Sequence, residues 1–143
     1  MAFRHLHNGN DVRMRKMQST ASVTIAVGDL LSLTTAGRVQ RSAANDASIV
    51  GIAQEAKAST DTATTPVLVA IIQPADEILA DATVTSPAQT DIGEEIDIVD
   101  HASVDVGASS NDECIVTRLY GTATDKVVVH FNPDYLFTGT GTI

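Results

Sequence analysis

The sequence predicts an all-β fold, a small antiparallel β-barrel or sandwich with little helix. Short runs that alternate apolar and polar side chains, or are rich in Val, Ile and Thr, recur about every 8 to 12 residues, as strands do in such folds. Clusters of Gly, Asn, Asp, Ser and Thr separate these runs. Hydrophobic residues make up 43% of the 143 residues but aromatic residues only 3%, with no Trp. We therefore expect one domain whose core is built from Val, Ile, Leu and Ala.

The chain contains ten strand-like runs in order. They cover residues 22–27, 30–34, 38–42, 48–56, 66–73, 77–84, 95–100, 103–107, 113–120 and 126–132. Because the connections between them are short, neighbouring strands are expected to pair antiparallel. Residues 86–93 form either a loop or one helical turn, with Ser86 as the cap and Pro87 at the first helical position.

The first 18 residues differ in charge from the rest of the chain. They hold four Arg and Lys side chains against one carboxylate, whereas the whole chain carries a net charge of −9. Residues 1–21 are therefore expected to form an extended basic arm on a body that spans residues 22–137, followed by a flexible tail at 138–143. Since the strands are expected to begin near Ser22, we expect the body to fold without the arm.

No predicted metal or cofactor site emerges from the titratable residues. His5 and His7 are spaced to lie on one side of an extended strand, and Asp11 could complete a triad, but a solvated pair on a terminal arm is the better interpretation. The acidic run at residues 91–105 lacks the EF-hand order, and Asp97 and Asp105 alternate with Ile and Val as on a solvated strand face. Cys114 is expected to be a small buried apolar residue.

The composition argues against nucleic-acid binding, catalysis and membrane association. A body of strongly negative charge repels phosphate, and no phosphate-binding loop is present, so no nucleic-acid partner is expected. His101 and His130 have no nucleophile motif beside them, and a sugar-cleaving site would need aromatic platforms, so we do not expect an enzyme. No apolar run approaches the length of a membrane span, and no signal-peptide pattern is present, so we expect no membrane partner and a chain kept inside the cell that makes it.

The stretch from Val27 to Asp81 resembles the head-decoration, or capsid cement, proteins of tailed bacteriophages. In these proteins a "GDLL" strand is followed by a turn, a second strand, an acidic residue, a strand of the form "hhGhAhE" (h, hydrophobic) and a hydrophobic run. The matching pieces here are Gly28 to Leu31, residues 38–42, Asn45 with Asp46, residues 49–55 and residues 67–72. The later segments "IGEEIDI" and "VDVGASSNDECIVTRLYGTATDKVVVHFN" are similar to the second half of such proteins, so that the resemblance covers about residues 20 to 132.

The resemblance implies a structural virion protein, neither catalytic nor cofactor-dependent. It would bind the outer surface of a bacteriophage capsid, with the major capsid protein as partner, after synthesis in the bacterial cytoplasm. It would assemble as a homotrimer at three-fold and quasi-three-fold positions of the shell. A core poor in large aromatic residues agrees with a chain that gains stability by burying apolar faces against copies of itself.

The basic arm is the part expected to hold the shell or a neighbouring subunit, since a flexible segment can become ordered on a partner. Its candidate contact residues are Phe3, Arg4, His5, Arg13, Met14, Arg15, Lys16 and Met17. Three other interpretations stay open at this point: a carbohydrate- or receptor-binding module, another phage structural part such as a tail or head-fibre base, and a metal-dependent enzyme using His5, His7 and the acidic run.

Overall fold

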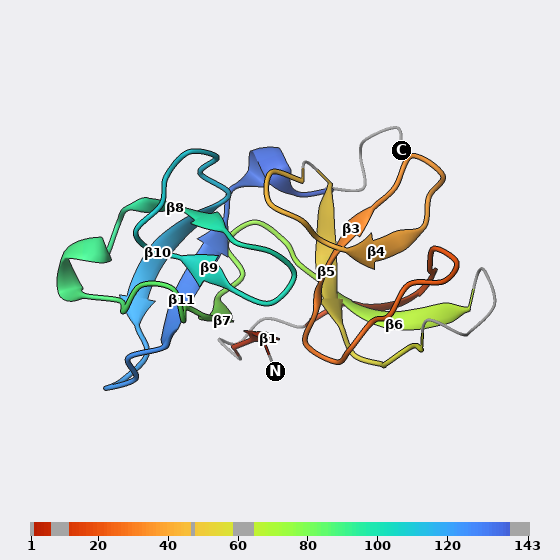
Figure 1. The fold of residues 1–143 in the computed structure, drawn as a ribbon, viewed down its shortest axis with the longest axis horizontal. Helices are drawn as coiled ribbons and strands as arrows, with labels where there is room; N and C mark the ends of the chain where they lie inside the picture. The colour runs from red at the N-terminus through yellow and green to blue at the C-terminus, as the bar shows by residue number, and fades with distance from the viewer. Residues whose placement is uncertain (1, 7–11, 47, 59–64, 138–143) are drawn as a thin grey trace.

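The computed structural model describes residues 2–6, 12–46, 48–58 and 65–137, and most of its regular structure is β-strand (Figure 1). Within these residues lie eleven strands and two short 3-10 turns, η1 (Gln89–Asp91) and η2 (Pro133–Tyr135). All pairs between these strands are antiparallel. The predictions of an all-β fold and of antiparallel pairing are therefore confirmed.

One sheet has six strands in the order β1-β7-β11-β10-β8-β9. Their bounds are β1 (Phe3–His5), β7 (Ile78–Asp81), β8 (Glu95–Ile98), β9 (Val104–Asp105), β10 (Cys114–Leu119) and β11 (Lys126–Phe131). The N-terminal strand β1 therefore lies at an edge, and its register sets Phe3 opposite Ala80 and His5 opposite Ile78.

The second sheet has five strands in the order β2-β6-β5-β3-β4 and curls into a half-barrel (Figure 1). Its strands are β2 (Met14–Gln18), β3 (Leu30–Leu33), β4 (Val39–Arg41), β5 (Ile49–Ala53) and β6 (Pro66–Ile71). The two edge strands approach each other at one end, where Ser19 forms a parallel bridge with Val39 and the Thr20 amide donates to the Val39 carbonyl at 2.9 Å. Along the rest of β2 no other described strand pairs with its outer edge, so the described part of the half-barrel is open there.

The apolar side chains form two clusters. The larger lies between the sheets and joins Phe3, Ile78 and Phe131 of the six-stranded sheet to Leu30 and Ile52 of the five-stranded sheet. The smaller lies within the half-barrel and is made by Ile25, Leu31, Val39, Val50, Ala53, Val67 and Val69. Because β5 contributes to both clusters, all five of its residues are buried, which explains its continuous apolar sequence.

Gly51 in the middle of β5 has a steric reason to lack a side chain. A Cβ atom at this position would lie 2.3 Å from the carbonyl oxygen of Ala70 and 2.7 Å from a methyl carbon of Val69, both on the paired strand β6. No real Cβ makes contacts this short, so the close approach of β5 and β6 requires glycine here.

The region predicted as an extended arm differs most from expectation. Residues 3–5 form β1 and residues 14–18 form β2, so the prediction that the strands begin near Ser22 is wrong. Cross-strand pairing to β7 and β6 supplies the backbone hydrogen bonds, and burial of Phe3 adds apolar contact, which overrides the polar composition of the segment. The predicted tail at residues 138–143 lies outside the described residues.

Two further predictions need correction. Residues 22–27 do not form a strand, because Ser22 has a φ of 60° and the Asp29 carboxylate accepts a hydrogen bond from the Ala26 amide at 2.8 Å, which closes a turn. Near Pro87 the chain forms only the short turn η1, which begins after Ala88. There the Asp91 carboxylate accepts from the Ala88 amide at 2.7 Å, so Ser86 is not the cap.

Candidate interaction surface

The residues predicted to contact a partner do not form one site. Phe3, Arg4 and His5 belong to β1 of the six-stranded sheet, whereas Arg13 and residues 14–17 lie at β2 of the five-stranded sheet. His7 and Asp11 lie outside the described residues. The two groups therefore lie on different sheets.

Phe3 belongs to the core and offers no surface to a partner. Its side chain is 0% exposed, and its ring centroid lies 6.1 Å from that of Phe131 with the rings tilted by 51°. This is the range in which aromatic pairs attract each other. Its assignment as a contact residue therefore conflicts with its burial, and its role is structural.

Arg4 and His5 contact other residues of their own chain. Arg4 Nη2 donates to the Tyr120 hydroxyl at 3.3 Å, and His5 Nε2 lies 3.4 Å from Asp76 Oδ2. Burial lowers the pKa of His5 below 6.5, although the Asp76 carboxylate acts in the opposite direction. Both ring nitrogens are buried without a hydrogen bond of good geometry to any described residue, so the contact with Asp76 is a weak one.

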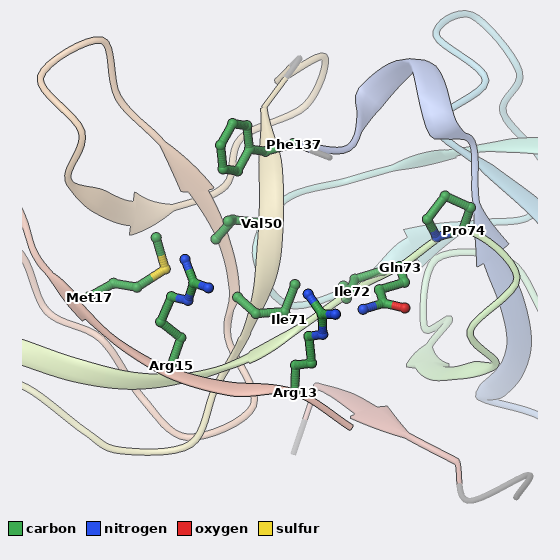
Figure 2. Close-up of a pocket in the computed structure, with 9 residues that line it drawn as sticks. All are labelled: Arg13, Arg15, Met17, Val50, Ile71, Ile72, Gln73, Pro74 and Phe137. Atoms are coloured by element: carbon green, nitrogen blue, oxygen red, sulfur yellow. The ribbon is translucent and has the colours of Figure 1, made fainter. Parts of the chain in front are cut away.

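Strand β2 has two distinct faces because side chains alternate along a strand. Lys16 lies on the outer face, where its ammonium group pairs with the carboxylate of Glu55. That carboxylate also accepts from the Leu68 amide at 3.0 Å, and the hydrogen bond from Lys16 is the main cause of the lowered pKa of Glu55. Arg13, Arg15 and Met17 share the opposite face, which points into the open side of the half-barrel (Figure 2).

A groove of about 250 Å³ lies along this inner face of β2 (Figure 2). Its polar lining comes from Arg13, Arg15 and Gln73, and its apolar lining comes from Met17, Val50, Ile71, Ile72, Pro74 and Phe137. In Figure 2 the side chains of Met17, Arg15 and Arg13 stand in a row on the side of β2 that faces Val50 and Phe137. The groove therefore combines an apolar wall with two guanidinium groups.

The two arginines of the groove have no counter-charge among the described residues, whereas several other cations of the chain do. Four other Lys and Arg side chains form ion pairs, namely Lys16 with Glu55, Arg41 with Asp29, Arg118 with Glu77 and Lys126 with Asp81. Within the described part of the chain, neither Arg13 nor Arg15 has a side-chain hydrogen bond or ion pair. The groove thus carries two positive charges that no described residue pairs with, on a molecule whose net charge is −9.

The carboxylates of β8 and β9 accept hydrogen bonds from groups in the neighbouring loops. The Asp97 carboxylate accepts from the amides of Ser110, Asn111 and Asp112 at 2.8 to 2.9 Å. Asp105 accepts from the Gly107 amide and the Thr85 hydroxyl, both at 2.9 Å. Among the residues that the structure describes, no group of three or more His, Cys, Asp and Glu side chains is placed to bind a metal ion. These carboxylates hold loops together.

Glu113 and Cys114 are buried side by side at the start of β10. The two Glu113 oxygens accept from the amides of Ile98 at 3.0 Å and Asn45 at 2.6 Å, and burial raises the pKa of this carboxyl. Burial also raises the pKa of the Cys114 thiol well above its ordinary value, which keeps it protonated and unreactive. The prediction that Cys114 is a buried apolar residue is confirmed.

The sequence indicated only one wall of the groove. Arg13, Arg15 and Met17 were predicted as contact residues, but of an extended arm and not of a strand within the fold. The opposite wall comes from β5, from β6 and from Phe137, which follows η2. Phe137 reaches this wall because its amide donates to the Ile49 carbonyl at 2.9 Å, a contact between segments far apart in the chain that no local pattern indicates.

No protein-family model matches this sequence, and a search of the curated proteins finds no significant match. In the described residues no helix has the length and apolar character needed to cross a membrane.

Proposed function

We propose that this chain is a structural protein of a bacteriophage virion that binds the outer surface of the capsid and stabilises the shell. In this role it acts as a homotrimer at three-fold and quasi-three-fold positions, with the major capsid protein as partner. It performs no catalysis and uses no cofactor.

The observation that carries the proposal is the ordered set of sequence pieces shared with capsid decoration proteins. Gly28 to Leu31 lead into β3, residues 49–55 contain β5, and residues 67–72 contain most of β6. These three strands are consecutive neighbours in the order β6-β5-β3. The glycine of the "hhGhAhE" piece is Gly51, where the packing of β5 against β6 excludes a side chain. The resemblance therefore falls on one continuous structural unit.

The surface of the chain also supports an assembling protein. Met14, Val27, Val84, Ile92 and Val99 are exposed large apolar residues, with Met14 at 54% and Val84 at 60%. Burial of such side chains against copies of the chain or against a shell contributes roughly 25 cal/mol per Å² of apolar area. Of the predicted contact residues, the exposed ones of β2 remain candidates, whereas Phe3 does not.

The proposal is tested by imaging and by sedimentation. Cryo-electron microscopy of particles purified from the source of the sequence should show this fold at the three-fold and quasi-three-fold positions of the shell. Density for it on tails or fibres alone, or on no part of the particle, contradicts the proposal. Sedimentation equilibrium at several concentrations should give a trimer, and a protein that is monomeric both in solution and on the shell contradicts the trimeric part.

A further inference from the structure

We propose that the groove beside β2 binds an extended acidic peptide segment, which pairs with the free edge of β2 and places one apolar side chain in the groove. The inference depends on β2 and the residues around it. It holds whether or not the chain decorates a capsid.

Strand β2 is the end strand of its sheet, and among the described strands it pairs only with β6. The Ile71 amide donates to the Arg13 carbonyl at 2.8 Å, which means that residues 13, 15 and 17 direct their backbone groups toward β6. The backbone groups of Met14 and Lys16 therefore point away from β6, and they have no hydrogen-bond partner in the part of the chain that the structure describes. An added strand would satisfy them.

The positive charges of the groove are regularly spaced. Arg13 and Arg15 are two residues apart on one face of β2, so their Cα atoms are separated by about 7 Å. A strand paired with β2 presents its own alternate side chains at the same spacing, directly opposite these two arginines. Since neither guanidinium group has a counter-charge among the described residues, carboxylates on alternate positions of the added strand are the matching chemistry.

The groove also has an apolar wall, which can hold an apolar side chain of the added strand. Met17 follows Arg15 on the same face, and Val50, Ile71 and Phe137 line the groove beside it (Figure 2). A cavity of about 250 Å³ accommodates one aliphatic side chain. Because every strand pair in this sheet is antiparallel, the added strand is expected to run antiparallel to β2. Its residue opposite Met17 then precedes those opposite Arg15 and Arg13, and the recognised pattern is apolar-x-acidic-x-acidic.

A nucleic acid is the other anionic polymer that two arginines could attract. It is disfavoured because the chain carries a net charge of −9 and because the groove wall is apolar, whereas phosphate backbones are bound by broad basic surfaces. The test includes it as a competing outcome.

The experiment is a nuclear magnetic resonance titration of the isotope-labelled full chain with the peptide Ser-Leu-Thr-Asp-Thr-Asp-Ser, acetylated and amidated at its ends. Up to about 1 mM, the range of weak peptide binding, the amide signals of Met14, Lys16, Val50 and Phe137 should shift in a saturable manner. Peptides with Asn in place of both Asp residues, or Ser in place of Leu, should bind at least about fivefold more weakly. Absence of binding, shifts confined to other surfaces, equal binding of the control peptides, or tighter binding of a single-stranded oligonucleotide each overturns the proposal.

Variants test the arginines directly. R13A/R15A should weaken binding of the Asp-containing peptide by about fivefold or more, because two cross-strand ion pairs are lost. Arg38 is a matched control, since its side chain also has no partner among the described residues but does not line the groove. R38A should bind the peptide as the unaltered protein does. Equal affinity of R13A/R15A and the unaltered protein overturns the proposal, and the charge-neutral peptide provides the same test without any change to the protein.

Discussion

The two N-terminal strands come from one basic stretch of sequence yet have opposite environments. β1 places Phe3 in the core between the sheets with no exposed surface, while β2 keeps Met14 54% exposed and has one edge that no described strand pairs with. Both strands form a single antiparallel pairing, β1 with β7 and β2 with β6. The comparison teaches that the basic composition shared by the two strands does not determine which of them is buried. The burial of one aromatic ring, that of Phe3, makes the difference. We expect β1 to determine stability and β2 to be available for binding.

The largest expected effect is loss of folding when residues 2–18 are deleted. The deletion removes Phe3 from the core and uncovers the edges of β7 and β6, which contradicts the expectation from sequence that the remaining chain folds alone. Circular dichroism and thermal unfolding should show no cooperative transition. A truncated protein that unfolds cooperatively near the temperature of the full chain would show that neither strand matters for stability.

The variants Phe3→Ala and Met14→Ala compare how much each strand contributes to stability. Truncation of the buried ring should lower the free energy of unfolding by about 3–5 kcal/mol, since it leaves a cavity beside Phe131. Truncation of the exposed Met14 should change it by less than about 0.5 kcal/mol. Denaturant unfolding measures both changes in the free energy of unfolding. Similar changes for the two variants would show that β1 and β2 do not differ in their contribution to stability.

Gly51→Ala tests the close pairing of β5 with β6, the strand on which β2 depends. The new methyl group would overlap the Ala70 carbonyl, so β5 and β6 have to separate, at a cost of about 1–3 kcal/mol. The amide signals of β6 and β2 should shift together, because β6 is the strand that β2 pairs with along its length in the described part of the chain. Unchanged unfolding of this variant would show that the two strands are packed less closely than described.

His5 makes the stability contributed by β1 dependent on pH. Burial lowers its pKa in the folded state below the ordinary value of 6.5, so the unfolded chain binds more protons and stability falls as pH decreases from 6.5 toward the lower folded pKa. His5→Gln should reduce this slope. Asp76→Asn should steepen it, since the carboxylate raises the pKa of His5. Unfolding measured at several pH values checks both signs, and a slope that neither variant alters contradicts the assignment.

The smallest expected effect is that of Lys16→Ala on β2. Lys16 and Glu55 are 58% and 41% exposed, and exposed pairs of this kind contribute little and are screened by salt. The variant should unfold at almost the same denaturant concentration as the unaltered protein, and the remaining difference should vanish in about 0.5 M salt. A large, salt-insensitive loss would assign β2 a structural role like that of β1.

Most strands could be predicted because their side chains carry the pattern themselves. The apolar run around Gly51 and the β-branched run of β11 identify strands without knowledge of their neighbours. β1 could not be recognised, because three residues with the sequence Phe-Arg-His show no period and become a strand only through pairing with β7. Residues 22–27 show the reverse case, since their apolar alternation is overridden by the turn that Asp29 closes.

For the candidate site, the sequence indicated the basic residues Arg13 and Arg15 but neither the strand β2 nor what lies opposite it. Val50 was predicted as part of a strand, yet its position facing Arg15 follows from the curl of the five-stranded sheet (Figure 2). Phe137 reaches the groove only through its backbone bond to Ile49. Such contacts depend on the three-dimensional arrangement of distant segments, which one sequence does not contain.

The pairing of β1 has a consequence for the order of events during synthesis on the ribosome. Phe3 is synthesised well before its partner Ala80, and β11, the strand on the far side of β7, is synthesised later still. β1 therefore cannot pair until β7 has been translated. Contacts between residues so distant in sequence slow folding. The six-stranded sheet is thus expected to form only after β11 has been translated, and the basic character of the segment that contains β1 keeps that segment hydrated until then.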